Sequence, residues 1–429
     1  MKKRILSLLL LSVMLLVPIL GFTSCGEEVT YLYIYNWGEY MPLGADESEN
    51  VLDLFEAYYY ETYGERLEVI YSIFSSNEEM YAKMKNGSSK IDLIIPSDYM
   101  VERLISEEKL EELDFANIPN FKNISERFLC PDYDTDGLYS VPYTYGLVGL
   151  IYNANAEILK DDPNFADPEN ISWNVLWDEK YKGQMLTFNN SRDAFGIAQY
   201  ILSAENGHTT EGDNYVNTND KARWDAALEK LKAQKPLVQA YVMDEVFNKM
   251  ESGAAVMAPY YAGDFYTMQD AQDENVELAL AYPKEGTNIF VDAFCIPKGT
   301  PAERKLAAER FIDFALATDV TIGEESYNIA KEIAEYICYA TPNDAVALDP
   351  EYEYFEDENL YPDLEGYPTY YFRNLPQPTL EYSNSLWEEL KIGGGGDTGI
   401  YIFTGLILGG IAGLCIFFGV RKRKRAKFY

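Results

Sequence analysis

Strand-like apolar segments alternate with helix-like amphipathic segments in the first third of the chain, and this alternation constrains the fold more than any other feature. Apolar residues alternate with polar ones, or form short unbroken runs, where strands are expected, and they recur on one face where helices are expected. The expected strands are 31–35, 67–73 and 90–96, and the expected helices are 47–63, a helix capped by Ser75 or Ser76, and 101–113. This order predicts an α/β fold in which helices cover both faces of a parallel sheet.

The middle of the chain continues with the same two kinds of segment. Two short strands within 138–153 indicate a crossover into a second lobe. Further strands are expected at 184–188, 253–259, 276–281 and 289–296, and helices at 173–182, within 214–233, at 301–316 and at 324–335. The tail to residue 390 is rich in tyrosine and acidic residues.

Aromatic and polar residues follow two of the early strands. Trp37, Glu39 and Tyr40 come after the first strand, and Ser97 and Tyr99 come after the third. Ligands of open α/β sheets bind beyond the carboxyl ends of the strands. Aromatic faces and a carboxylate suit an organic cation. An edge strand with a surface turn explains the first group equally well, and Ser97 also fits a plain helix cap.

The two ends of the chain read as targeting segments. Residues 1–25 have a basic start and an apolar run, as in a secretory signal, and they end in a lipoprotein-like box that would leave Cys25 lipidated. A signal without lipid and an incidental cysteine is the alternative. Residues 393–399 form a glycine-rich linker, 400–420 are long and apolar enough for a transmembrane helix, and 421–429 form a basic cytoplasmic tail. The body would then lie on the outer face of a bacterial cytoplasmic membrane.

The charge and the missing motifs exclude several classes of function. Nine of the 35 basic residues lie in the two ends, so the body sets 26 lysines and arginines against 70 acidic residues. Such a surface repels nucleic acids and attracts cations. One histidine excludes a multi-histidine metal site, and no nucleotide-binding or common hydrolase motif is present. We therefore expect no enzyme, no cofactor and no metal.

Cysteine and charge placement leave two further expectations. Cys130, Cys295 and Cys338 have no metal-type spacing, so free thiols are expected, although one pair could form a disulfide. Asp292 lies inside an apolar strand segment, and a charge in such a place needs a partner.

Six short motifs in a fixed order resemble the extracytoplasmic spermidine/putrescine-binding proteins of polyamine ABC transporters. The motifs span residues 35–40, 75–83, 92–99, 140–143, 283–286 and 339–343. The resemblance implies a two-lobed periplasmic-binding-protein-like fold with a ligand cleft between the lobes. It implies one lobe from 30–142 plus 283–340 and another from 143–282 plus 341–392. The implied partners are a polyamine and the permease subunits of an ABC importer with their ATPase.

The same resemblance implies a set of ligand-binding residues. Glu39 would meet a terminal ammonium group and Asp292 would bind an amine group. Asn190 and Asp193 stand where the family commonly has Asp and Glu, which leaves the preferred polyamine open. Phe290 stands where a tryptophan is common, and Tyr260 where a tryptophan or phenylalanine is common. The implied residues are Trp37, Gly38, Glu39, Tyr40, Ser97, Tyr99, Asn190, Asp193, Tyr260, Phe290, Asp292 and Tyr339.

These observations predict a solute-binding subunit that captures polyamines in an interlobe cleft and delivers them to a permease. Two alternatives remain open at this point. One is a binding protein for another solute, such as an amino acid, a quaternary amine or a ferric complex. The other is a surface-tethered sensor or enzyme.

Overall fold

A single large sheet organises the protein. The computed structural model describes residues 29–45, 48–87, 90–207 and 215–392. The strands of the sheet are β1 (Val29–Trp37), β2 (Arg66–Phe74), β3 (Leu93–Ile94), β4 (Ser140–Asn153), β7 (Met257–Tyr261), β8 (Leu278–Ala281), β9 (Thr287–Cys295) and β12 (Thr369–Tyr370). They run in the order β2-β1-β3-β9-β4-β7, with β12 beside β9 and β8 beside β4. The first three strands are parallel, and β9 and β4 run antiparallel to their neighbours β3 and β9.

Two small sheets lie apart from the large one. β5 (Leu186–Phe188) pairs with β6 (Ala240–Val242), and β10 (Val320–Ile322) pairs with β11 (Glu325–Tyr327).

Helices pack around the sheets, and their ends follow ordinary capping chemistry. The α-helices are α2 (Val51–Tyr63), α3 (Asn77–Asn86), α4 (Asp98–Ser106), α5 (Ser191–Glu205), α6 (Lys221–Gln234), α7 (Val246–Glu251), α8 (Ala262–Ala271), α9 (Ala302–Ala315), α10 (Ile329–Ile337), α11 (Asp344–Ala347) and α12 (Gln377–Ile392). Ser76 caps α3 by accepting a hydrogen bond from the Glu79 N–H, as expected. Gly64 ends α2 with a φ of 69°, a conformation that costs glycine little.

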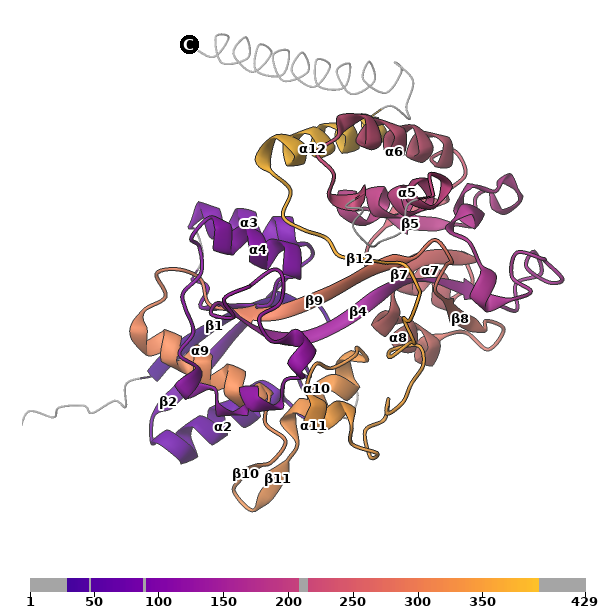
Figure 1. Cartoon of the computed structure of the whole chain (residues 1–429). Helices are drawn as coiled ribbons and strands as arrows, with labels where there is room; N and C mark the ends of the chain where they lie inside the picture. The colour runs from indigo at the N-terminus through magenta and orange to yellow at the C-terminus, as the bar shows by residue number, and fades with distance from the viewer. Residues whose placement is uncertain (1–28, 46–47, 88–89, 208–214, 393–429) are drawn as a thin grey trace, which may run out of the picture.

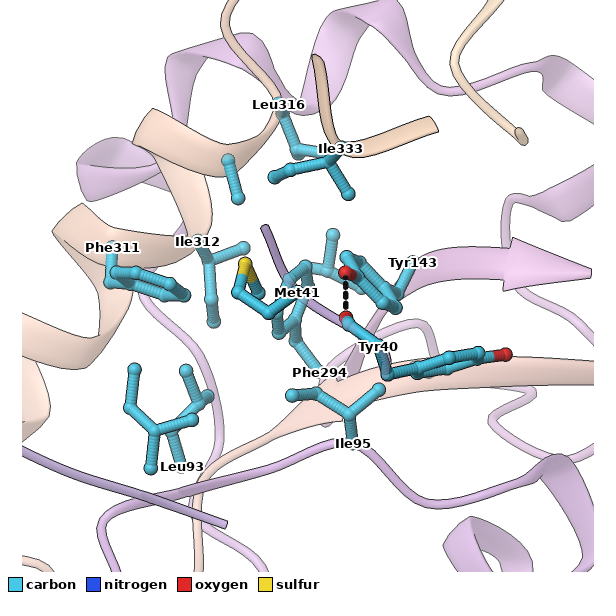
Figure 2. Packing of buried hydrophobic residues seen from close by; sticks show 14 of the residues in the cluster. Tyr40, Met41, Leu93, Ile95, Tyr143, Phe294, Phe311, Ile312, Leu316 and Ile333 are labelled. Atoms are coloured by element: carbon cyan, nitrogen blue, oxygen red, sulfur yellow. Dashed lines mark hydrogen bonds between the residues drawn. The ribbon is translucent and has the colours of Figure 1, made fainter. Parts of the chain in front are cut away.

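The buried apolar side chains form two clusters. The first joins β1, β3 and the end of β9 to α2, α9 and α10; Figure 2 shows Met41, Leu93, Phe294 and Phe311 inside it. The second joins β5 and β7 to α5, α6 and α12. The long strands β4 and β9 run through both halves of the molecule (Figure 1). The two-lobed α/β arrangement is confirmed, whereas the exact lobe boundaries stay a prediction.

Tertiary pairing changed some of the expected elements. The two short strands expected within 138–153 are one 14-residue strand, β4, because β9, β7 and β8 supply partners along its length. A register shift between Pro142 and Thr144 accommodates the proline, which has no N–H to donate. The helix expected at 324–335 begins only at Ile329, after the Asn328 cap, because residues before it pair as β11.

One part of the predicted fold class needs a correction. We expected one membrane-crossing helix, and no helix within 29–45, 48–87, 90–207 and 215–392 is long and apolar enough for that. The longest helix in these ranges, α12, has 16 residues, whereas a span takes about 20 apolar residues. The expected span at 400–420 lies outside the described residues and has no support from the structure.

The other terminal predictions also lie outside the described residues. These are the signal at 1–25 with its Cys25 lipid site, the linker at 393–399 and the tail at 421–429. The three cysteines of the body are free thiols, and Cys130 is exposed rather than buried.

Candidate ligand-binding site

Tyr40 is held firmly at the carboxyl end of β1. The hydroxyl of Tyr143 donates to its carbonyl oxygen over 2.6 Å (Figure 2), and the Asn36 amide donates to the same atom over 3.2 Å. The Tyr40 hydroxyl donates to Oδ2 of Asp292 over 2.7 Å. Tyr40 therefore links the segment after β1 to the middle of β9.

Asp292 is a buried carboxylate with unused hydrogen-bonding capacity. It lies in β9 opposite Thr144 of β4, and only 3% of the residue is exposed. Its Oδ1 atom has no hydrogen-bond partner among the described residues. Burial raises the pKa of Asp292 to about 6, although hydrogen bonds received by the carboxylate oppose the shift. An unsatisfied buried oxygen of this kind is a natural acceptor for a bound ammonium group.

Asp264 is a second carboxylate of the site, and sequence reasoning missed it. It lies in the first turn of α8, directly after β7 ends at Tyr261. Asp264 keeps some solvent contact. Its surroundings nevertheless remove water from the carboxylate and raise its pKa to about 7, partly offset by a hydrogen bond from Tyr339. The signal that could have revealed it is the strand-end position itself.

Gly263 explains how Tyr339 reaches α8. A Cβ atom on Gly263 would lie 2.1 Å from Cδ2 of the Tyr339 ring, so only glycine fits at this position. Tyr339 follows α10 and packs with the first core, whereas α8 belongs to the second. The contact therefore brings residues of both lobes together.

A third carboxylate, Asp193, lies in the first turn of α5. The amide of Asn190 donates to its Oδ2 atom over 2.6 Å, and the hydroxyl of Tyr261 donates to the same atom over 2.9 Å. Asn190 also caps α5 by accepting from the Asp193 N–H. Burial raises the pKa of Asp193, and the two hydrogen bonds lower it in part. Sequence reasoning identified Asn190 and Asp193 but not Tyr261.

Four rings connect the three carboxylates, and we call them the aromatic path: Tyr40, Tyr339, Phe290 and Tyr261. Successive ring centroids are 5.5, 6.1 and 5.4 Å apart. Gly146 leaves room for the path, because a Cβ there would lie 2.8 Å from Cζ of Phe290. The hydroxyls of Tyr40 and Tyr261, at the two ends of the path, donate to Asp292 and Asp193. None of the three carboxylates is paired with a lysine or arginine among the described residues.

Three other predicted residues lie beside this site with partners of their own. Trp37 donates from Nε1 to the Ile95 carbonyl over 2.9 Å. Ser97 forms a backbone bridge with Asp292, and its hydroxyl accepts from the Asn77 amide. Tyr99 donates to Glu78 over 3.0 Å. These contacts place Ser97 next to the Asp292 carboxylate and Tyr99 farther out, toward α3.

Three other implied residues, Gly38, Glu39 and Tyr260, are neither rings of the aromatic path nor carboxylates beside it. Glu39 is exposed, has a φ of 48°, and accepts a hydrogen bond from Tyr336. The Gly38 backbone is also exposed. Tyr260 is buried, with its ring 5.6 Å from that of Phe188 and 5.1 Å from that of Tyr261, so it contacts the aromatic path through Tyr261. Tyr261 differs from Tyr260 in that its hydroxyl donates to the Asp193 carboxylate.

The fold and the site define a two-lobed solute-binding protein with an acidic, aromatic site at the junction of its lobes. The model of the bacterial extracellular solute-binding protein family matches residues 53–360. The chain belongs to that family.

Relatives with known names carry related functions. The spermidine/putrescine-binding periplasmic protein of Salmonella typhimurium is 32% identical over 336 residues, which cover 78% of this chain and 84% of the relative. The putrescine/cadaverine-binding protein of Pseudomonas aeruginosa is 28% identical and covers 84% of this chain and 93% of its own length. The crystal structure of the spermidine/putrescine ABC transporter substrate-binding protein PotD from Streptococcus pneumoniae matches with a TM-score of 0.63 and 29% identity, over 85% of this chain and 99% of that one.

Proposed function

We propose that this protein is the extracytoplasmic polyamine-binding subunit of an ABC importer. One observation carries the proposal: Asp292, Asp264 and Asp193 have pKa values raised by burial and lack a basic partner among the described residues, and tyrosine hydroxyls donate to Asp292 and Asp193. Carboxylates held out of water without a cation are costly. A ligand that brings several ammonium groups would remove that cost.

The aromatic path supports a ligand whose charges are joined by methylene groups. Ring faces bind alkyl chains and attract cations, and the path runs continuously from Tyr40 at Asp292 to Tyr261 at Asp193. Putrescine and spermidine have this chemistry, and the names of the relatives point to the same ligands. The ligand is bound and released without any bond being made or broken.

The position of the site between the two cores supports a role in delivering the ligand to a permease. Asp292 and Tyr339 lie with the first core, whereas Asp193 and Tyr261 lie with the second. A ligand that contacts both sides favours the closed arrangement of the lobes. When the lobes open at the permease of an ABC importer, which its ATPase energises, the polyamine would pass from the binding protein to the permease.

Calorimetric titration with putrescine and spermidine tests the proposal. We expect one-to-one binding by the wild-type protein and no measurable binding by Asp292→Asn, which keeps the side-chain shape but removes the charge. Glu39→Gln tests the implied ammonium contact of Glu39 in the same assay. The uncharged diol 1,4-butanediol serves as the ligand control. Absence of heat with both polyamines, on protein shown to be folded by circular dichroism, would refute polyamine binding.

A further inference from the structure

The segment between β12 and α12 meets the opposite lobe through one arginine. Phe372 and Leu375 of this segment pack in the second core, whereas Met100 and Leu104 of α4 pack in the first. The segment runs beside α4 in Figure 1, and the side chain of Arg373 reaches that helix. Arg373 therefore lies where the packing of one lobe meets the packing of the other.

The guanidinium group of Arg373 is bound by oxygens on the side of the first core. It donates to both carboxylate oxygens of Glu102, from Nε to Oε2 over 3.0 Å and from Nη2 to Oε1 over 2.8 Å. Nη2 also donates to the carbonyl oxygen of Asp132 over 2.9 Å. The N–H of Asn374 donates to Oε2 of Glu102 over 2.7 Å. Two parallel hydrogen bonds between planar groups fix both their distance and their orientation.

The backbone around Arg373 is fixed to the side of the second core. The N–H of Arg373 donates to Oδ1 of Asn217 over 2.8 Å, and the Asn217 amide donates to the carbonyl oxygen of Tyr371 over 2.8 Å. The guanidinium carbon of Arg192, in the first turn of α5, lies 4.3 Å from the centre of the Phe372 ring. Arg373 is thus held to one lobe through its backbone and to the other through its side chain.

The Arg373–Glu102 pair is partly shielded from water. The two side chains are 34% and 26% exposed, and the hydrogen bonds to Glu102 raise the pKa of Arg373. A partly buried ion pair is screened less by salt than one on an open surface. Separating its partners is costly where each would be left without its counter-charge in a partly dry place.

The pair lies one helical turn from the ligand-binding site. Glu102 and Tyr99 are three positions apart in α4, so their side chains are neighbours on the helix surface. The lobe arrangement that keeps Glu102 bonded to Arg373 is also the one in which Tyr339 packs against Gly263 and the aromatic path is continuous. Contacts at both flanks of the site therefore depend on the same placement of the lobes.

We propose that Arg373 and Glu102 form an interlobe clasp that holds the lobes in the ligand-binding arrangement before the ligand arrives. A hydrogen bond acts only over about 3 Å, so moving the lobes apart at this point breaks the clasp, and its energy favours the closed population. The apparent affinity for a ligand rises in proportion to the population that is ready to bind it. The effect on affinity rests on the proposed function, whereas the effect on the lobe arrangement does not.

Hydrogen–deuterium exchange of the full chain, followed by mass spectrometry without ligand, tests the clasp directly. Glu102→Gln keeps the side-chain shape and removes the charge. Residues 262–268, where Tyr339 packs against Gly263 across the lobe junction, should exchange about 10-fold faster in this variant, because exchange follows the population of the opened form. This reporter is remote from the substitution, so a merely local loss of contacts on α4 would not change it.

The matched control is Glu111→Gln. Glu111 pairs with Lys298 and accepts a hydrogen bond from the Gly299 N–H, beside Leu110 and Ile296 of the first core. We expect this variant to exchange at residues 262–268 as the wild type does. Equal exchange there in wild type and Glu102→Gln, on protein with a wild-type circular dichroism spectrum, would overturn the clasp.

Calorimetric titration with putrescine tests the consequence for binding. Glu102→Gln and Arg373→Gln should each lower affinity about 10-fold, and the double variant should lower it by no more than either change alone. Losses that multiply to about 100-fold would show that the two residues act separately and would overturn the pairing. Unchanged affinity in both single variants would overturn the effect on affinity. If the wild type binds no putrescine, the proposed function fails, and the exchange experiment still decides the clasp.

Discussion

Lowering the pH should weaken polyamine binding strongly, because two carboxylates of the site take up protons in an unusual range. The pKa of Asp292 is raised to about 6 and that of Asp264 to about 7. A bound ammonium group favours the charged carboxylate, so both pKa values fall on binding and protons are released. The amines of putrescine resemble lysine and stay protonated throughout this range.

The expected size follows from these values. A pH of about 5 is one unit below the pKa of Asp292 and two units below the pKa of Asp264. Ionising the two carboxylates at this pH therefore costs factors of about 10 and about 100 in affinity. The combined loss between about pH 8 and about pH 5 is on the order of 1000-fold. Titration calorimetry at several pH values measures it, and repeating the titration in buffers of different ionisation enthalpy counts the protons released.

The Asp264→Asn variant separates the two contributions. It should bind more weakly at pH 8, and the pH dependence should become smaller by a factor of about 100, because Asp264 no longer titrates. Circular dichroism at each pH confirms that the protein stays folded. An affinity that is flat from about pH 8 to about pH 5 would refute the assignment of these carboxylates to the ligand.

Three further predictions test the same geometry. Burial raises the folded-state pKa of Asp264, so this carboxylate destabilises the ligand-free fold as the pH rises. Asp264→Asn should therefore increase the free energy of unfolding, measured by urea denaturation, by about 2 kcal/mol at about pH 8 and by less at about pH 5. No gain in stability at pH 8 would contradict the raised pKa. Tyr261→Phe should lower polyamine affinity by about 10-fold through loss of its hydrogen bond to the Asp193 carboxylate, whereas the neighbouring control Tyr260→Phe should leave calorimetric affinity unchanged. Equal effects of the two variants would contradict a role for that hydrogen bond in binding. Gly263→Ala should lower affinity more than 10-fold by displacing the Tyr339 ring, with a far-ultraviolet spectrum like that of wild type, and unchanged affinity would show that the ring is not needed at the site.

The sequence by itself determined the local elements and part of the site. The alternation of apolar residues and the Ser76 cap fixed β1, β2 and α3 close to their observed positions. These features depend on neighbours within a few residues, which a sequence shows directly. The charge of Asp292 inside an apolar strand also indicated a buried carboxylate before any partner was known.

Only the tertiary structure decided how distant segments meet. The single strand β4 required three partner strands, and the face of β7 that carries Tyr261 depends on the register of β7 against β4. Asp264 and Tyr339 are 75 positions apart, and their contact exists because α8 and the segment after α10 pack across the lobe junction. Arg192 is an ordinary charged residue in the sequence, and only the structure shows that it is buried and donates to the oxygens of Val216 and Asn217. Burial and long-range contacts set the pKa values and the unpaired charges, and neither can be read from the neighbouring residues along the chain.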